Sequence, residues 1–305
     1  MAKSEVVTIG HILYDTRCYV DGFPSPSRTT FTQKPIATGC GGSAANTAVN
    51  LCRLGKKASM IGRIGDDFTG RQLLHELEKK GVGTAGIQKS KGTHTGISIV
   101  LIDKNAEVEV IEDVGANEPL ALGKEAEKAI KAAKHLHLTG TSIKALEKAS
   151  AIAEKAGTTV SFDPGRSKSH LGKKGLGKIL ENVDYLILNR AELGRITKAW
   201  NPLTGARELV KEFNLSCVIK SGEKPIIFES RHEHFSVYPV HLKPIDTIGA
   251  GDAFSAGFIC GLLEGKKHID CVKLGAACSA AKILRQGAQS LPPRKDVEKF
   301  LKRVK

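Results

Sequence analysis

The stretch IDTIGAGDAFSAGF, residues 245–258, decides how this sequence folds. It joins a strand-like tail to three very small residues, Gly249, Ala250 and Gly251, and then to a segment with the pattern of a helix. Such a turn presents unpaired backbone N–H groups and the positive end of a helix dipole to an anion. The next residue is Asp252, so a carboxylate stands beside a cradle for negative charge. A simple N-cap would explain Asp252 taken alone.

The composition is that of one globular α/β domain spanning residues 1–305. The chain is 41% hydrophobic and 5% aromatic, so Ala, Ile, Leu and Val can build a sizeable core. No stretch has a disordered or low-complexity composition. A chain of this length fits a single α/β core with an appendage.

The net charge of +14 allows two interpretations, a nucleic-acid partner or a solvated basic surface with a site for phosphorylated ligands. Lysines are interleaved with acidic residues, as in residues 122–136 and 292–305. This pattern favours the second interpretation, without nucleic acid.

The seven cysteines include no C-x-x-C pair, and several lie in apolar runs. They are typical of buried thiols in a reducing compartment. Residues 1–10 lack the apolar core of a signal peptide, and no run reaches membrane-spanning length. We therefore expect a cytoplasmic protein that does not interact with membranes.

Strand and helix patterns alternate through the middle and C-terminal parts of the chain. Strands are predicted at 135–140, 158–165, 183–189, 215–222, 225–230 and 233–240, and helices at 142–157, 205–213 and 271–285. Strands separated by helices indicate β-α-β units and a mostly parallel sheet covered on both faces.

Two regions break this alternation. Residues 12–38 and 92–112 alternate apolar and polar side chains without intervening helices, and DKNAE at 103–107 has the composition of a hairpin turn. We expect these regions to form a small antiparallel sheet. Such a sheet would act as a lid that closes over a ligand and excludes water.

Polar residues follow the ends of several predicted strands. They are Asp15, Asp163, Arg166, Asn189, Glu192, Lys220, Ser221, Gly222, Asp246 and Asp252. Ligands of parallel sheets bind at the carboxyl ends of strands, so this set indicates a site that handles phosphate. The sequence has neither a Walker A motif nor a G-x-G-x-x-G with a downstream acid. The glycine-rich segment 37–55 could serve a ligand or only tight helix packing.

Four segments together resemble the ribokinase family of carbohydrate and nucleoside kinases, which is phosphofructokinase-B-like. They are GGSAANTAVNLCRLG (41–55), NRAE (189–192), DTIGAGDAFSAGF (246–258) and RQGAQSLPPRKDVEKFL (285–301). The third is close to the family's D-T-x-G-A-G-D signature and is highly specific. The resemblance covers essentially the whole chain.

The resemblance implies a three-layer α/β/α fold with a mostly parallel central sheet and a small β lid. It implies an ATP- and Mg²⁺-dependent kinase in which Asp252 is the general base and Gly249, Ala250 and Gly251 hold the transferring phosphoryl group. The substrate would be held by Asp15, Gly41, Gly42 and Asn46. The nucleotide would be held by Asn189, Lys220, Ser221, Gly222, Thr247, Gly249 and Gly251, with Mg²⁺ ordered through water by Asn189 and Glu192. Arg166 would be a further cation that binds phosphate or a charged substrate. Alternatively, Arg166 forms only a structural ion pair.

Departures from the family pattern bear on the substrate. Ser43 follows the double glycine where ribokinases often have lysine, which favours a nucleoside, whereas VGANEPL (114–120) resembles a ribokinase segment. Lys220 and Pro225 stand where many relatives have the first Thr and the last Gly of a T-x-G-x-x-G motif. The proline bears on the shape of the local turn and not on the activity. We expect phosphorylation of the primary hydroxyl of a ribose-containing substrate, preferably a nucleoside. The alternatives are ribose, fructose, 2-keto-3-deoxygluconate or a sugar phosphate, and a non-catalytic sugar- or nucleotide-binding regulator.

Two further expectations concern an ion and a partner. The resemblance implies a K⁺ ion held by backbone carbonyls, for which Asp246, Ile248 and Ser290 are the matching positions. The lid would have open strand edges, which favours a homodimer formed through the lid.

Overall fold

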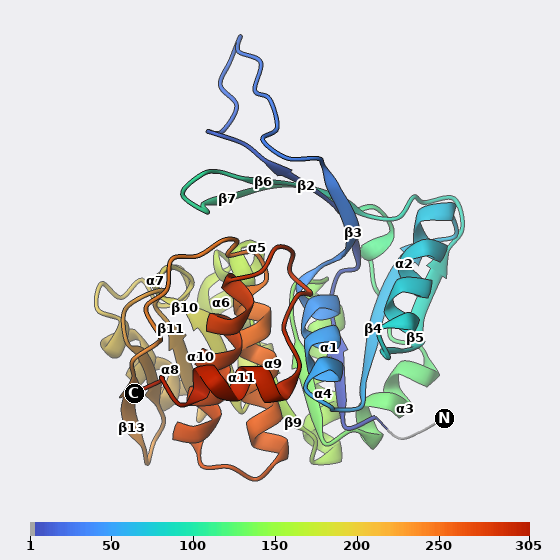
Figure 1. Ribbon diagram of the computed structural model, residues 1–305. Coiled ribbons are helices and arrows are strands. Elements are labelled where there is room, and N and C mark those ends of the chain that lie inside the picture. The colour runs from blue at the N-terminus through green and yellow to red at the C-terminus, as the bar shows by residue number, and fades with distance from the viewer. Residues whose placement is uncertain (1–3) are drawn as a thin grey trace.

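A nine-stranded, mostly parallel sheet forms the centre of the protein (Figure 1). The computed structural model describes residues 4–305. The strand order is β13-β12-β11-β10-β9-β8-β1-β4-β5, in which only β12 and β13 run antiparallel to their neighbours. The strands are β1 (Val6–Ile9), β4 (Ala58–Gly65), β5 (Gly83–Ser90), β8 (His135–Leu138), β9 (Thr159–Phe162), β10 (Tyr185–Asn189), β11 (Ser216–Lys220), β12 (Ile226–Glu229) and β13 (His234–Val237). The mostly parallel sheet expected from the sequence is confirmed.

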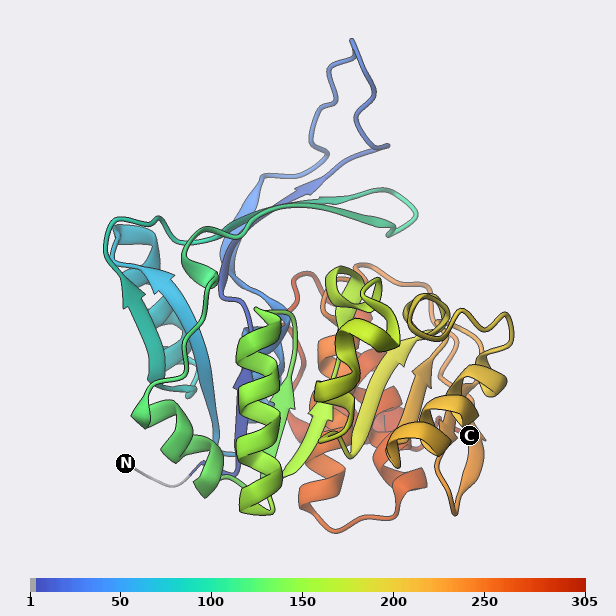
Figure 2. The same ribbon diagram turned by 180° about the vertical axis from the view of Figure 1, so that it is seen from behind.

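Helices cover both faces of this sheet, as the two opposite views show (Figures 1 and 2). Alternate residues of a strand point to opposite faces, and accordingly Val6 packs in one core cluster and Val7 in the other. One layer contains α1 (Ser43–Arg53), α2 (Phe68–Lys79), α9 (Ala250–Leu263), α10 (His268–Ile283) and α11 (Arg294–Leu301). The other contains α3 (Lys124–Ala132), α4 (Ile143–Ala156), α6 (Gly172–Leu180), α7 (Arg190–Thr197) and α8 (Pro202–Phe213). The short helices η1 (Gly115–Asn117) and α5 (Gly165–Ser169) lie in connections.

A four-stranded sheet lies over the carboxyl ends of the parallel strands (Figure 1). Its order is β3-β2-β6-β7, with β2 (Leu13–Tyr19), β3 (Ala37–Gly41), β6 (Ile97–Ile102) and β7 (Val108–Asp113). The expected small sheet is therefore present, but it is not wholly antiparallel, because β2 and β6 pair in parallel. They belong to separate segments of the chain, so no hairpin constrains their relative direction.

The segment between β2 and β3 does not form the strands expected throughout residues 12–38. It projects beyond the small sheet (Figure 2), and within it only Val20 and Thr32 form an isolated bridge. Most of its side chains are exposed. Alternation without a covering layer was insufficient to form a strand there.

Several predicted local features are confirmed by their chemistry. Helix α4 ends at Gly157, whose left-handed backbone caps it. The hairpin between β6 and β7 turns at residues 103–107, where the Asp103 carboxylate accepts from the N–H groups of Asn105 and Glu107. All seven cysteines are unpaired, and five of them are buried.

Two hydrogen bonds join the small sheet to the loop before α9. The Tyr19 hydroxyl donates to Asp246 Oδ2 over 2.9 Å, and the Thr247 hydroxyl donates to the carbonyl of Ala106 over 2.8 Å. The small sheet is thus held directly above the segment that opened the sequence analysis.

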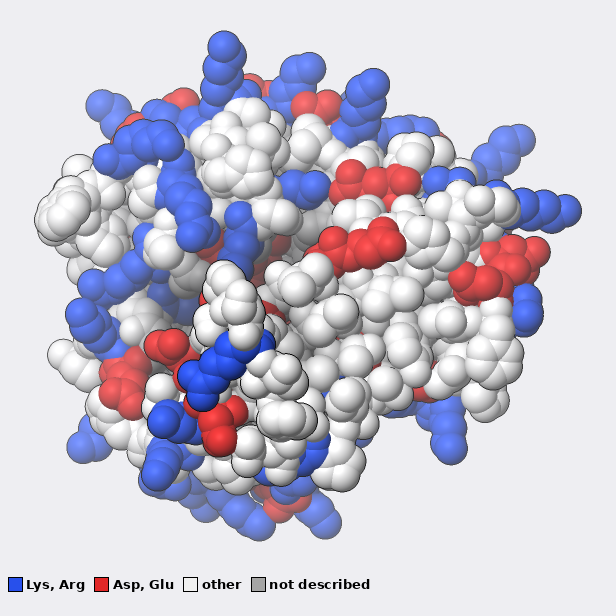
Figure 3. All heavy atoms as spheres, turned by 90° about the horizontal axis from the view of Figure 1, so that it is seen from above, with Lys and Arg blue, Asp and Glu red and all other residues white. Residues whose placement is uncertain are grey.

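The distribution of surface charge and the apolar character of the helices bear on whether nucleic acid or a membrane is a partner. Seen from above, Lys and Arg side chains project around the rim of the molecule, with Asp and Glu side chains among them (Figure 3). No helix within residues 4–305 combines the length and apolar character needed to cross a bilayer.

Candidate active site

A cavity of about 980 Å³ lies between the two sheets. Residues predicted from the sequence line much of it: Asp15, Gly42, Asn46, Arg166, Asn189, Glu192, Lys220, Thr247, Ile248, Gly249, Gly251 and Asp252. The strands β9, β10 and β11 deliver Asp163, Asn189 and Lys220 to it at their carboxyl ends. The fold therefore gathers, in one cavity, predicted residues that lie up to 237 positions apart, from Asp15 to Asp252.

Asp252 stands in the first turn of α9 and faces α1 across the cavity floor. Its Oδ2 accepts a hydrogen bond of 2.8 Å from Asn46 Nδ2. Gln289 Nε2 in turn donates to Asn46 Oδ1 over 3.0 Å, which fixes the orientation of the amide. Burial raises the pKa of Asp252 to about 6, and the Asn46 hydrogen bond opposes that rise. The carboxylate still predominates at neutral pH.

The turn before Asp252 forms the expected cradle with one difference. Gly249 caps α9 with φ 71°, and a Cβ there would lie 2.6 Å from Ala288 Cα, so only glycine fits. The Ala250 N–H donates to the Thr247 carbonyl over 3.1 Å and so is engaged in the turn itself. Among the described residues, no hydrogen bond uses the N–H of Gly249 or Gly251. These two amides remain open to an anion.

Lys220 lies across from the cradle. A Cβ placed on Gly251 would be 3.3 Å from Lys220 Nζ, so the ammonium reaches the start of α9. Its Nζ donates to Asp163 Oδ2 over 2.8 Å. Burial favours a neutral amine, but Asp163 and Glu192 outweigh it and raise the pKa of Lys220. Lys220 therefore supplies a fixed positive charge. Asp163, which the sequence placed only at a strand end, holds it in position.

Asn189 and Glu192 form a capping box at the start of α7. Asn189 Oδ1 accepts from the Glu192 N–H over 2.9 Å, and Glu192 Oε2 accepts from the Asn189 N–H over 2.8 Å. Part of the N-x-x-E motif thus serves the helix. Burial, followed by the nearby Asp163 charge, raises the pKa of Glu192. Its Oε1 accepts no hydrogen bond from residues 4–305 and is available to a metal or its water.

Asp15 lies within β2 of the small sheet, directly against the double glycine, and not at the end of a strand as the sequence predicted. A Cβ on Gly41 would lie 2.0 Å from the Asp15 carboxylate, so a side chain at position 41 would displace it. Ser98 Oγ on β6 donates to Asp15 Oδ1 over 2.5 Å. Burial raises the pKa of Asp15 to about 6, while the Ser98 hydrogen bond lowers it. Ser98 was missed in the sequence because it lies within a strand without a motif.

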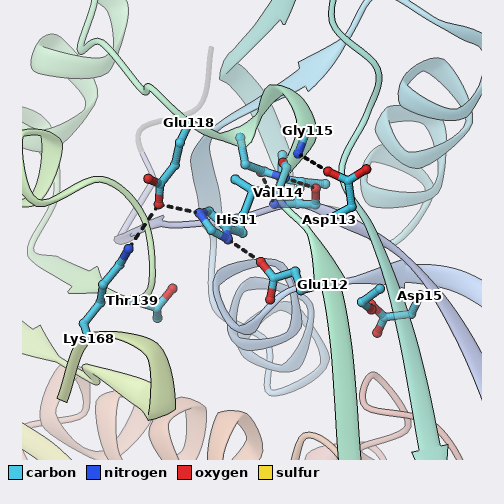
Figure 4. Close-up of polar contacts among 12 residues, drawn as sticks. His11, Asp15, Glu112, Asp113, Val114, Gly115, Glu118, Thr139 and Lys168 are labelled. Carbon is cyan, nitrogen blue, oxygen red and sulfur yellow. Dashed lines mark hydrogen bonds and ion pairs between the residues drawn. The ribbon is translucent and has the colours of Figure 1, made fainter. Parts of the chain in front are cut away.

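His11 joins the small sheet to the main sheet at one wall of the cavity (Figure 4). Its Nδ1 lies 2.8 Å from Glu112 Oε1, and its Nε2 lies 3.0 Å from Glu118 Oε1. Lys168 Nζ also contacts Glu118, over 3.1 Å. Burial favours the neutral ring, but the two carboxylates outweigh it and raise the pKa of His11. Of this cluster, only Glu118 lies in a segment that the sequence singled out, VGANEPL at 114–120; no motif marks His11, Glu112 or Lys168.

The remaining predicted residues lie at the margins of the site. Arg166 is exposed and donates to the Val108 carbonyl of the small sheet over 3.3 Å. Ser221 and Gly222 do not line the cavity, and the Ser221 hydroxyl accepts from Arg190 Nε over 2.7 Å. The carbonyl oxygen of Asp246, one of the expected K⁺ ligands, instead accepts a hydrogen bond from Lys282 Nζ over 2.7 Å.

The chain matches known proteins along nearly its whole length. Residues 3–295 match the model of the pfkB family carbohydrate kinases. The chain is 32% identical, over 97% of both chains, to an ATP-dependent ribose-1-phosphate kinase of Halopiger xanaduensis.

Two solved structures share the fold. The Arabidopsis thaliana ribokinase complexed with ribose and ATP superposes with a TM-score of 0.85 at 24% identity, covering 98% of this chain and 99% of that one. The Methanocaldococcus jannaschii nucleoside kinase superposes with a TM-score of 0.83 at 23% identity, covering 99% of this chain and 100% of that one.

Proposed function

We propose that this protein transfers the γ-phosphate of ATP to the primary hydroxyl of a ribose-containing substrate. The premise is that the chain belongs to the pfkB family of carbohydrate kinases and is a phosphotransferase acting on a hydroxyl group. One observation carries the proposal. The Asp252 carboxylate stands immediately beside the open amides of Gly249 and Gly251. A base and an anion cradle on one helix start are what in-line transfer to a hydroxyl requires.

In the proposed reaction Asp252 accepts the proton of the substrate hydroxyl as its oxygen attacks the γ-phosphorus. The bond from that phosphorus to the β,γ-bridging oxygen breaks, and ADP leaves with the bond's electron pair. The amides of Gly249 and Gly251 donate to the oxygens of the transferring group, and Lys220 offsets their negative charge. These groups act by positioning and by neutralising charge, as phosphoryl transfer demands.

The site also fits Mg²⁺ on the nucleotide phosphates. Magnesium takes oxygen ligands and keeps several waters, so one or two protein carboxylates suffice. Glu192 Oε1 is the open carboxylate oxygen on this side of the cavity, and Asn189 orients Glu192 through the capping box. When bound, the ion would neutralise phosphate charge; Asn189 and Glu192 would hold its waters.

For the acceptor we favour ribose 1-phosphate. The relative that shares 32% identity over nearly the full length is named for that substrate. Arg166 lines the cavity and pairs with no carboxylate among residues 4–305, so its guanidinium can take the sugar phosphate. The cavity is lined by a single aromatic residue, Phe23, which leaves little surface for a base to stack on.

A nucleoside, the substrate favoured from the sequence, remains the second candidate. Phe23 lines the cavity from the projecting segment between β2 and β3, and a base could stack on it. In that case Arg166 would bind the ATP phosphates and not the acceptor. The same holds for free ribose and other unphosphorylated sugars.

The substrate is tested by measuring kcat/KM with ATP for ribose 1-phosphate, ribose, adenosine, guanosine, inosine, cytidine and fructose. We expect ribose 1-phosphate to rank first. Arg166→Gln should raise its KM about tenfold, the range for a lost charge-assisted contact, and should leave the KM for ribose unchanged. Arg71→Gln, at an exposed position away from the cavity, is the control. A nucleoside ranking first, with no effect of Arg166→Gln, would refute the preference.

We also propose that the protein forms a homodimer through the small sheet. The face of its strands turned away from the cavity carries the exposed apolar side chains Ile97, Ile99 and Ile111, and Phe31 and Ile36 lie in the adjoining segment. Exposed apolar side chains on one face of a sheet favour a protein partner. Sedimentation equilibrium should give a dimer for the wild type and a monomer for Ile99→Lys, whereas a monomeric wild type would exclude the proposal.

A further inference from the structure

Lys282 is a buried charge that the proposed reaction does not use. It lies in the last turn of α10, and within residues 4–305 it is the one lysine or arginine whose side chain is fully buried. A buried ammonium is costly unless it is paired and hydrogen-bonded. Lys282 therefore needs a buried partner of opposite charge.

The partner is Asp246, which is also fully buried. Lys282 Nζ donates to the Asp246 carbonyl oxygen over 2.7 Å and lies 3.5 Å from Asp246 Oδ1. Three further donors saturate the same carboxylate: the N–H of Ile248 at Oδ1, and the Tyr19 hydroxyl and the N–H of Gly287 at Oδ2. The pair is therefore complete, with every contact at hydrogen-bonding or ion-pair distance.

Asp246 begins the loop that forms the anion cradle. Its carboxylate bonds to the loop itself at Ile248, to the small sheet at Tyr19 and to the segment after α10 at Gly287. Three elements that surround the cradle thus converge on one negative charge, and Lys282 is the cation that balances it. The open amide of Gly249 is three residues away in the same loop.

The sequence interpretation assigned a cation to this loop, held by carbonyls that include that of Asp246. The Lys282 ammonium already binds that carbonyl. We propose that Lys282 is a built-in monovalent cation: its ammonium fixes the 246–251 loop and makes the protein independent of K⁺ for both stability and phosphoryl transfer.

Lys282 is thus a positioning residue, since it acts through Asp246 rather than on the substrate. The catalytic part of this inference rests on the proposed function, whereas the stability part does not. Thermal unfolding therefore tests the inference separately from activity.

The test compares the wild type with a matched pair of variants in KCl, NH₄Cl and tetramethylammonium chloride of equal ionic strength. Lys282→Ala leaves space that a small cation can occupy, and Lys282→Met fills that space with an apolar chain. Lys273→Met, on the same helix but only partly buried, is the control. Each protein's melting temperature is measured without substrate, and then its kcat.

We expect the wild type and Lys273→Met to show the same melting temperature and kcat in all three salts. Lys282→Ala should lose about tenfold in kcat in tetramethylammonium, less than the loss of a direct anion-hole donor, and should recover stability and rate in K⁺ or NH₄⁺. Lys282→Met should be impaired in every salt.

A wild-type melting temperature or rate that rises with K⁺ would overturn the inference, as would an unimpaired Lys282→Met. If neither variant folds, the wild-type comparison decides: indifference to K⁺ supports the inference and stimulation refutes it. A protein that is inert as a kinase but whose Lys282→Ala variant is stabilised by K⁺ would refute the proposed function and leave the built-in cation standing.

Discussion

The strands in the centre of the large sheet are buried on both faces, whereas the strands of the small sheet are covered on one face at most. Every residue of β1 and β8 is buried, while β6 alternates between exposed and buried residues and β7 is almost wholly exposed. The large sheet fixes Asp163, Asn189 and Lys220 at strand ends through its core. The small sheet is held over them mainly by a few polar contacts and a small apolar cluster.

This difference in burial indicates that the two sheets have different roles in the reaction. Chemistry should depend on groups anchored by the large sheet and α9, and a change there should lower kcat. Binding should depend on closure by the small sheet, and a change there should raise KM with little effect on kcat. The following predictions test this difference in roles.

Removing the proposed base should have the largest effect. Asp252→Asn keeps the shape of the side chain and can still accept from Asn46, but it cannot take a proton. The expected loss in kcat is about 10²- to 10⁴-fold, the usual contribution of a general base, with little change in melting temperature. Asp270→Asn, an exposed acid at the start of α10, is the matched control. Wild-type kcat in Asp252→Asn would exclude Asp252 as the base.

Acid should inactivate the site in a defined pH range. Asp252 acts as a base only when ionised, and its pKa of about 6 means that it protonates as the pH falls through 6. Asp15 has a pKa of about 6 as well, so both charges are lost together. We expect kcat/KM to be flat near neutrality and to fall at least about tenfold per unit well below pH 6. A profile that is flat down to pH 4 would contradict the assignment.

The backbone of the cradle should tolerate no side chain. Gly249→Ala requires a left-handed alanine and places Cβ 2.6 Å from Ala288 Cα. We expect a loss of about 1–3 kcal/mol in the free energy of unfolding from strain, together with lost kcat, measured by urea denaturation and assay. Gly222→Ala has a similar φ of 62° but open space around it, so it isolates the cost of the backbone. Equal losses in the two variants would refute close packing at Gly249.

The smallest effect is expected at the connection between the sheets. Tyr19→Phe removes the hydroxyl that donates to Asp246 and should cost about 1 kcal/mol, the net value of one hydrogen bond. If the small sheet serves closure, KM should rise several-fold while kcat changes little. Tyr14→Phe, on the same strand but without a hydroxyl hydrogen bond within residues 4–305, is the control. A fall in kcat with unchanged KM would instead show that Tyr19 supports the chemical step, like the groups anchored by the large sheet and α9.

The sequence was most informative where a residue type and a backbone geometry coincide. The strand-helix alternation predicted the large sheet, and the small residues at 249–251 predicted the cradle, because both depend on local pattern. Contacts made across the fold were not predictable in this way. Ser98 beside Asp15, Asp163 beside Lys220 and Gln289 behind Asn46 are each separated from their partners by 57 or more positions.

Lys282 is a further residue whose contacts could not be predicted from the sequence. In the sequence it is one lysine among many at the end of an apolar helix, and only the fold shows that its ammonium is buried against Asp246. The family resemblance implied K⁺ at this loop, whereas the Asp246 carbonyl accepts from the ammonium of Lys282, 36 positions away.

In the proposed reaction, Asp252 and the adjacent amides direct ATP's γ-phosphate to a primary sugar hydroxyl. The most direct measurement is the ³¹P NMR spectrum of ribose 1-phosphate incubated with ATP, Mg²⁺ and the wild-type protein. We expect a new phosphomonoester resonance coupled to the two C5 protons, formed as ATP is converted to ADP. Persistence of ribose 1-phosphate, ribose and nucleosides unchanged while ATP stays intact, or phosphate appearing on a ring hydroxyl instead, would contradict it.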